Sequence, residues 1–389
     1  MLRHSIRIAI NGIDFTSGRM GGVETYFRNL IGCFQAMDTG DKVVVLINRN
    51  QKNHLPLNSP SLEIVECDYA MPSMGWLARG IAKNIFQVDP LASRIDRMKI
   101  DVIHHPFSIL NPRKSRVPSV LTFWDLQHEF YPEYFSSYEL WLRRRLYKAS
   151  VEEATRVIVS AEFTKKCLVE RYDIDSGRVD VIPLGYGSEF RVIDHLDGID
   201  RIKNKYDLSK PFLYYPAATW PHKNHKRLFA ALKLISERYH FDGELVLSGI
   251  AVQSQAGFRA CIENAGLASV VKVLGYVPYE DLPYLYNLAR ILVFPSLFEG
   301  FGIPIVEAMA CGCPVLCSNV TSLPEVVGEA GVLFDPSSSE DMAENIWSVW
   351  NSPEERRSMR AKGLERVKAF RWEETAGKTL DVYRRASGK

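Results

Sequence analysis

The 389-residue sequence has no uninterrupted apolar run of about 18 residues, the length that a membrane-spanning helix needs. It also has no apolar N-terminal segment that resembles a signal peptide. Its 48 basic and 46 acidic side chains give a net charge of only +2, without a long basic run, so nucleic acid is not an expected partner. These absences indicate a cytoplasmic protein, and its seven cysteines, mostly inside apolar segments, are expected to be reduced core thiols.

Two common phosphate-binding motifs are missing as well. Neither G-x-G-x-x-G nor G-x-x-x-x-G-K-[ST] occurs in the sequence. Cys311 and Cys313 have neither the spacing nor the neighbouring histidines of a zinc site. Asp173 and Asp175 precede a loop far from the other motifs. We therefore expect no metal site and no bound cofactor.

The sequence is long enough for two domains of similar size. Short apolar runs alternate with helical patterns along both halves, which favours α/β domains with parallel sheets. The polar stretch from Ser188 to Lys210 contains no core-like run, and we interpret it as a linker. Domains are therefore expected over residues 1–187 and 188–371. The expected strands are Ile6–Asn11, Val43–Ile47, Leu62–Glu66, Asp101–His105, Ser119–Phe123, Arg156–Ser160, Val179–Ile182, Phe212–Tyr215, Glu244–Ser248, Val270–Leu274, Ile291–Phe294 and Pro314–Cys317.

The stretch from 291 to 317 predicts a strand, loop, helix and strand in succession. The helix is expected from Ile303 to about Cys311, and Pro304 suits its first turn, where the backbone N–H groups have no partners anyway. Sheets of this kind bind ligands at the carboxyl ends of their strands. The loop at 297–302 is therefore predicted to line a site.

Two carboxylates mark this site. Glu299 lies in the loop, whereas Glu307 lies inside the helix among side chains that look buried. A buried carboxylate is costly unless something binds it. Helical side chains lean toward the N-terminus, so Glu307 is expected to reach the mouth that Glu299 lines. A helix N-terminus with two nearby acceptors for hydroxyl groups suits a nucleotide sugar, although a salt-bridged core Glu beside a solvated one has the same spacing.

The segment SLFEGFGIPIVEAMACGCPV, continued by SNVTSLPEVVGEAG, resembles the donor-site signature of retaining glycosyltransferases of family 4. The resemblance implies an α/β GT-B fold, with two Rossmann-like domains facing each other across a cleft. It also implies that Glu307 holds the nucleotide ribose and Glu299 the donor sugar. The amides at Phe301 and Gly302 would contact sugar hydroxyls and phosphate, with Ile303 completing the donor-binding set.

Two further motifs resemble phosphate-binding parts of the same family. GGVETY resembles its N-terminal glycine pair, here Gly21 and Gly22, which faces the donor phosphates. PHKN resembles its phosphate-binding lysine motif, which makes Lys223 a point charge on the diphosphate. The arginine that often precedes this lysine is missing, since alanines occupy 217–218, so we expect Lys223 to act with His222 and helix amides.

Two other segments carry expectations from the resemblance. Tyr276 and Val277 match the family segment that brackets the nucleotide base. The last helix, over residues 372–387, is expected to return and pack on the first domain, anchored by Trp372 and Tyr383.

The acceptor side is expected to follow the strand that ends near Phe123. Trp124-Asp125 stands where many family members have His-Asp, so we take His128 as the candidate histidine, with Asp125 fixing its tautomer or replacing it. His128→Ala is then expected to slow transfer by about 10²-fold or more. His104 and His105 are alternatives.

The stretch from Trp76 to Phe86 has apolar residues at helical spacing with Arg79 and Lys83 between them. It predicts either a helix that faces the acceptor or a membrane surface, or an ordinary amphipathic helix packed on the sheet.

The resemblance as a whole implies a metal-independent, retaining glycosyltransferase. It would move a hexose, with mannose from GDP-mannose as the expected donor, to a glycan or lipid-linked glycan, with peripheral contact at the inner membrane surface. A nucleotide-sugar epimerase of the same architecture and a non-catalytic subunit of a polysaccharide assembly complex are the alternatives.

Overall fold

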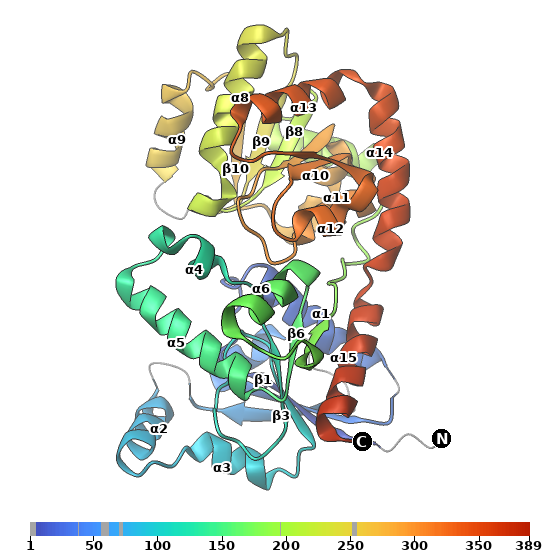
Figure 1. The fold of residues 1–389 in the computed structure, drawn as a ribbon. Coiled ribbons are helices and arrows are strands. Elements are labelled where there is room, and N and C mark those ends of the chain that lie inside the picture. The colour runs from blue at the N-terminus through green and yellow to red at the C-terminus, as the bar shows by residue number, and fades with distance from the viewer. Residues whose placement is uncertain (1–4, 38, 56–61, 70–72, 195, 251–254) are drawn as a thin grey trace. The chain divides into compact units, whose positions relative to one another are not determined.

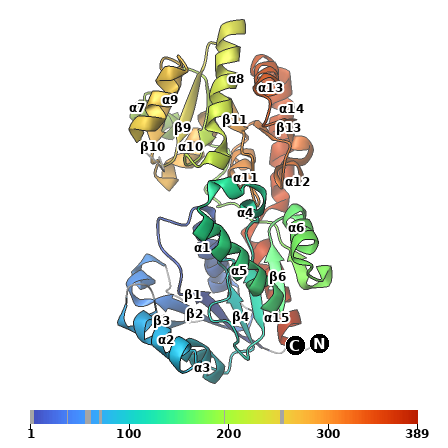
Figure 2. The same cartoon turned by 60° about the vertical axis from the view of Figure 1, so that its left-hand side comes forward.

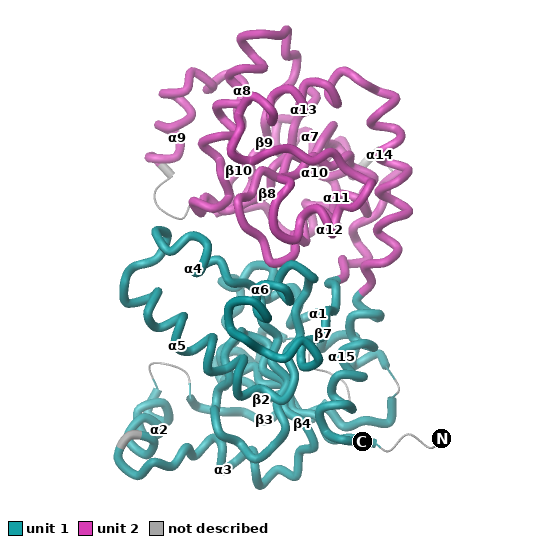
Figure 3. Tube along the Cα trace, in the orientation of Figure 1, with its two compact units in different colours: residues 1–184, 372–389 teal, residues 185–371 magenta. Residues whose placement is uncertain are grey.

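The computed structural model describes residues 5–37, 39–55, 62–69, 73–194, 196–250 and 255–389, and the chain forms two compact units (Figure 3). Unit 1 comprises residues 1–184 and 372–389, and unit 2 comprises residues 185–371. The first boundary between the two units follows Leu184, whereas the boundary predicted from the sequence follows Gly187. No helix formed by the described residues is both long enough and apolar enough to cross a bilayer.

Unit 1 is built on a seven-stranded parallel sheet in the order β3-β2-β1-β4-β5-β6-β7. Its strands arise from short apolar runs, such as Ile8 to Ile10, whose side chains are fully buried. All seven predicted strands are confirmed. They are β1 (Arg7–Gly12), β2 (Lys42–Asn48), β3 (Leu62–Cys67), β4 (Val102–His105), β5 (Ser119–Thr122), β6 (Arg156–Val159) and β7 (Val179–Val181).

Helices of unit 1 connect these strands, and one comes from the far end of the sequence. They are α1 (Gly22–Ala36), α2 (Met74–Ile85), α3 (Pro90–Arg97), α4 (Gln127–Phe130), α5 (Ser137–Glu153), α6 (Glu162–Tyr172) and α15 (Trp372–Ser387). Figures 1 and 2 show α15 beside α1. The Tyr383 hydroxyl lies 2.7 Å from His104 Nδ1, and Arg384 pairs with the buried Asp41 at 2.8 Å. The last helix is therefore part of the core of unit 1.

Unit 2 is built on a six-stranded parallel sheet in the order β10-β9-β8-β11-β12-β13. Its strands are β8 (Phe212–Pro216), β9 (Glu244–Ser248), β10 (Val271–Gly275), β11 (Ile291–Phe294), β12 (Val315–Ser318) and β13 (Gly331–Phe334). The first five confirm the predicted strands, and β13 was not predicted. Its helices are α7 (Leu196–Tyr206), α8 (His225–Arg238), α9 (Gln255–Asn264), α10 (Leu282–Leu288), α11 (Ile303–Ala310), α12 (Leu323–Val327), α13 (Ser339–Asn351) and α14 (Pro353–Arg366).

The stretch from Ser188 to Lys210 is not a linker, and that prediction was wrong. It contains α7, and Phe190 and Ile202 are fully buried in unit 2. Its apolar residues are too widely spaced to form a run, because only a narrow stripe of α7 contacts the core. Lys205 and Tyr206 also bind a buried carboxylate, so polar residues fix this helix in place.

Each sheet has a point where the strand order reverses, and ligands of such sheets bind outside the carboxyl ends of the strands there. In unit 1 this point lies between β1 and β4, and in unit 2 it lies between β8 and β11. The loops that follow these four strands are therefore the first places to look for a site.

Candidate functional site

The loops after β8 and β11 bring Lys223 and Glu299 together. Lys223 ends the short turn Pro221–Lys223, and Glu299 lies in the loop before α11. Lys223 Nζ lies 2.5 Å from Glu299 Oε1, and the two side chains are 18% and 14% exposed. This contact joins residues 76 positions apart, in the two loops that flank the switch point, so a phosphate bound here would compete with Glu299 for the ammonium group.

Hydrogen bonds hold the two loops against each other. The Tyr215 hydroxyl donates to Lys223 O at 2.8 Å, and Leu297 N donates to His222 O at 2.7 Å. Asn224 Nδ2 donates to Pro295 O at 3.0 Å. Burial, followed by the charge of Lys223, lowers the pKa of His222 to about 4. His222 is therefore neutral near pH 7 and adds no charge for a phosphate.

Glu307 lies on the buried face of α11 and is 6% exposed. The Tyr286 hydroxyl donates to its Oε2 at 2.8 Å. Burial raises the pKa of Glu307 to about 7, the Tyr286 hydrogen bond opposes this shift, and the charge of Glu189 adds to it. The carboxyl group therefore titrates near neutrality, as a group kept for a ligand rather than for an ion pair would.

The N-terminus of α11 is formed by a loop with little freedom. Gly302 has φ 106°, a conformation that favours glycine, whereas a Cβ there would meet only the movable end of the Leu323 side chain, at 2.9 Å. Ser322 Oγ contacts the carbonyl oxygens of Glu299 and Phe301 at 3.0 Å each. In the first turn of α11, Pro304 has no N–H and Ile305 N donates to Gly302 O at 3.0 Å, so Ile303 contributes the amide that is left for an anion.

Tyr276 and Val277 follow β10, on the same edge of the sheet. Tyr276 is 73% exposed, whereas Val277 is buried. Gly249 N donates to Gly275 O at 2.7 Å, which ties this loop to the one after β9. An exposed aromatic ring here suits stacking with a nucleotide base, and that role stays a prediction.

In unit 1, Gly21 is the N-cap of α1 and has φ 54°. A Cβ at this position would meet no atom within 4 Å, so the backbone conformation rather than lack of space favours glycine. Gly21 and Gly22 are both exposed. Their contact with donor phosphates stays a prediction.

His128 is a core residue, which corrects the expectation that it contacts the transferred sugar. Its ring is fully buried, its Nε2 lies 3.2 Å from the Tyr172 hydroxyl, and the Tyr147 ring packs edge-on at 5.1 Å. Burial lowers the pKa of His128 to about 4, although the Glu129 carboxylate opposes this shift. Asp125 accepts a hydrogen bond from Gln127 N at 2.9 Å and is half-buried, so its acceptor-side role stays a prediction.

The alternative histidines are also structural. His104 is buried between the Thr122 hydroxyl, 2.7 Å from its Nε2, and the Tyr383 hydroxyl. His105 Nδ1 lies 3.2 Å from Asn11 Nδ2. Burial lowers the pKa of both histidines to about 3, so neither is charged near pH 7.

Helix α2 does not bury its apolar side chains as an ordinary amphipathic helix would, which was one of the two predictions for this stretch. It packs on α3, yet Leu77, Ile81 and Ile85 are exposed. Arg79 instead is the buried side chain, held by Asp89 at 2.7 and 2.8 Å. Sequence periodicity finds an apolar stripe but does not show which face is covered.

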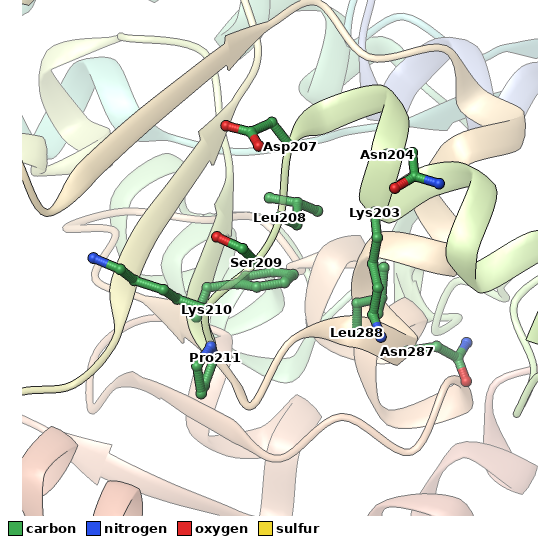
Figure 4. A pocket seen from close by; sticks show the side chains of 10 residues that line it. Lys203, Asn204, Asp207, Leu208, Ser209, Lys210, Pro211, Asn287 and Leu288 are labelled. Atoms are coloured by element: carbon green, nitrogen blue, oxygen red, sulfur yellow. The ribbon is translucent and has the colours of Figure 1, made fainter.

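Figure 4 shows a pocket in unit 2 of about 680 Å³ that is not part of this site. Lys203, Asp207 and Lys210 line it, together with Phe212, the first residue of β8. It therefore opens at the amino ends of the strands, the edge opposite Lys223 and Glu299. Within the described part of the chain, no group of three or more His, Cys, Asp or Glu is arranged to hold a metal ion.

Comparisons with known proteins agree with the two-unit description. A family model described as Glycosyltransferase Family 4 matches residues 20–189, and one described as Glycosyl transferases group 1 matches residues 198–366. O-antigen chain mannosyltransferase B of Escherichia coli is 32% identical over 284 residues, which cover 73% of this chain and 74% of that protein.

Two solved structures share the fold. Sucrose-phosphate synthase of Thermosynechococcus elongatus has a TM-score of 0.75 at 21% identity and covers 98% of both chains. HepE of Anabaena, solved in complex with UDP and glucose, has a TM-score of 0.71 at 18% identity, covering 97% of this chain and 98% of that one.

Proposed function

This chain belongs to the family 4 glycosyltransferases and has the GT-B fold, and from that premise we propose that it moves a mannosyl residue from GDP-mannose to a glycan or lipid-linked glycan. Transfer proceeds with retention of configuration and without a metal ion. The observation that carries the proposal is the contact between Lys223 and Glu299 at the switch point of unit 2. The choice of mannose rests on the Escherichia coli relative.

The residues of unit 2 divide the donor among them. Glu307 accepts hydrogen bonds from the ribose hydroxyls, and the exposed ring of Tyr276 stacks on the base. Lys223 and the backbone amide of Ile303, at the N-terminus of α11, bind the diphosphate. Glu299, released from Lys223 by the phosphate, accepts hydrogen bonds from the sugar hydroxyls.

Catalysis follows from charge stabilisation. Negative charge develops on the diphosphate as the glycosidic bond breaks, and each well-placed donor contributes about 3–4 kcal/mol to the transition state. Lys223 is such a donor, since its ammonium group has a fixed position and little exposure. The departing phosphate itself accepts the proton of the incoming hydroxyl, so no strong protein base is needed.

We further propose that unit 1 rests on the cytoplasmic face of a membrane. Exposed Leu77 and Ile81 on α2 support this contact. On α5, Tyr138 and Trp141 are exposed and stacked 6.3 Å apart, with Arg145 over the Trp141 ring at 5.4 Å. Tyr and Trp favour membrane interfaces, and Arg is attracted to anionic lipids.

Incubation of the purified protein with labelled GDP-mannose tests the function. We expect GDP release and a mannosylated product only when a glycan acceptor is added. Turnover of the sugar nucleotide at the same rate without an acceptor would instead identify a nucleotide-sugar epimerase or hydrolase. Absence of GDP-mannose and GDP binding in calorimetry would identify a non-catalytic subunit.

A further inference from the structure

Unit 1 has a pocket of about 640 Å³ at the carboxyl edge of its own sheet. The loop after β1 contributes Arg19, the end of β2 contributes Asn48, the loop after β4 contributes Asn111, and α2 contributes Trp76 and Lys83. β1 and β4 flank the switch point of this sheet. The pocket therefore occupies the position where such a sheet binds a ligand, and none of the donor-binding residues lines it.

Asn48, which lines this pocket, has a side-chain donor that no described residue satisfies. Its side chain is 3% exposed, and among the described residues its Nδ2 has no hydrogen-bond partner. A buried donor without a partner costs about 1–3 kcal/mol, so such groups are rare unless a ligand completes them.

The charges around the pocket favour an anion. Arg19 and Lys83 are exposed, and neither forms an ion pair with another described residue. Arg79 is fixed by Asp89 and also donates to Asn111 Oδ1 at 2.7 Å. The pocket's carboxylate, Asp14, is the exception, and it accepts from Asn111 Nδ2 at 2.9 Å.

Helix α2 has two different faces at this pocket. Trp76, Arg79 and Lys83, spaced by three and four residues, line the pocket. Leu77, Ile81 and Ile85, spaced by four, form the exposed α2 stripe. Trp76 offers a flat apolar surface to a sugar ring beside the cations. One short helix thus presents an aromatic and cationic face next to an apolar one.

We infer that this pocket binds the acceptor through a phosphate group attached to a sugar, and that the α2 stripe contacts the lipid that carries this phosphate. The inference rests on the proposed function in that the ligand is the acceptor of the transfer. A phosphate suits Arg19, Lys83 and Asn48 Nδ2, because all three are donors and two are cations. The neighbouring stripe distinguishes a lipid-borne sugar phosphate from a free one.

The first experiment compares Lys83→Gln with the wild type. Calorimetry with mannose 1-phosphate should show binding that methyl mannoside lacks, and Lys83→Gln should weaken it by about tenfold. Lys166→Gln, an exposed lysine of α6, is the control and should change nothing. GDP affinity is measured in parallel. If the wild type binds GDP and Lys83→Gln leaves the affinity for mannose 1-phosphate unchanged, the inference is overturned while the proposed function stands. If the wild type binds no GDP, the proposed function itself is overturned.

Asn48→Leu separates binding from stability. Replacing a donor that has no partner should leave the melting temperature unchanged or raise it, while affinity for mannose 1-phosphate falls by about tenfold. A lower melting temperature with unchanged affinity would show that Asn48 is structural and would contradict the assignment.

The last arm identifies the source of the phosphate. Mannosyl phosphate carrying a dodecyl chain should bind more tightly than mannose 1-phosphate, and Ile81→Gln should abolish the difference. If the alkyl chain adds no affinity, the ligand is a soluble sugar phosphate, and the role of the α2 stripe is refuted.

Discussion

Among the described residues, unit 2 buries three carboxylates, Glu244, Asp281 and Glu307, and the last two have surroundings of opposite character. The first of these two is Asp281. Its carboxylate oxygens receive Lys205 Nζ at 2.5 Å and the Tyr206 hydroxyl at 2.7 Å, with Arg201 3.4 Å away. Burial by itself would raise the pKa of Asp281, but these hydrogen bonds and charges outweigh burial and lower it. Asp281 is thus a fully satisfied anion that fixes α7 to α10.

Glu307 is the second of these two carboxylates, and no cation pairs with it among the described residues. Tyr286 is its hydrogen-bond partner, and burial raises its pKa to about 7. Glu299 is intermediate, since it pairs with one cation, Lys223. Asp281 shows that burial alone does not mark a functional acid. Glu244 is buried too, and its Oε1 has no partner among the described residues, but it is the first residue of β9 and so lies at the amino edge of the sheet. Glu307 combines burial without a paired cation with a position in α11, directly after the loop that follows β11.

The largest effect is expected on turnover, at the ion pair between Lys223 and Glu299. Lys223→Ala should lower turnover by about 10²–10³-fold, because its charge stabilises the departing diphosphate. Affinity for guanosine should stay unchanged. Steady-state kinetics beside Lys226→Ala, an exposed lysine of α8, provide the control. A loss of guanosine affinity as large as the loss of turnover would place Lys223 outside the phosphate site.

A smaller effect, on stability, is expected at the satisfied carboxylate. Asp281→Asn should lower the free energy of unfolding by about 2–3 kcal/mol, below the range for a fully buried pair because Lys205 and Arg201 are half exposed. Urea unfolding measures this change against Asp200→Asn, an exposed residue of α7. GDP affinity should not change. If GDP affinity fell while the free energy of unfolding stayed the same, Asp281 would be a ligand-binding residue like Glu307, and the comparison would fail.

The uncompensated carboxylate should show the reverse pattern. Glu307→Gln should weaken GDP binding by about tenfold, since an amide accepts the ribose hydroxyls less strongly than a carboxylate. The melting temperature should hold or rise, because the change removes a buried group that is costly to ionise. Calorimetry and thermal unfolding are run beside Glu344→Gln, an exposed residue of α13. Unchanged affinity with a lower melting temperature would make Glu307 structural.

The smallest effect is a pH dependence. The carboxyl group of Glu307 loses its proton near pH 7, so guanosine affinity should rise a few-fold between pH 6 and pH 8. Its folded pKa exceeds the ordinary value of 4.5, so this group's contribution to stability decreases as pH rises from about 4.5 through 7. Guanosine carries no phosphate that titrates in this range. A flat profile, or an equal rise in Glu307→Gln, would show that another group titrates.

The elements of the fold were largely predictable because each strand is a compact apolar run. Ile291–Phe294, closed by Pro295, shows this local signal, and the loops after β8 and β11 follow from it. Helix α7 was missed because its fixation depends on the distant Asp281.

One part of the candidate site was also predictable from the sequence, and another part was not. Lys223 and Glu299 were predictable as neighbours, since parallel strands place their following loops on one edge. The hydrogen bond from Tyr286 to Glu307, the burial of His128 and the open pocket beside Asn48 depend on packing between segments far apart in the sequence. Spacing along the chain contains no signal for these contacts.

The position of α15 has a consequence for synthesis. Translation runs from the N-terminus, so every strand of unit 2 has been made before Tyr383 is available to His104. Until α15 has been made, the surface of unit 1 that buries Thr375, Leu380 and Tyr383 in the complete structure is uncovered. Although the strands of unit 1 precede unit 2 in the sequence, the core of unit 1 therefore cannot be completed until all of unit 2 has been synthesised.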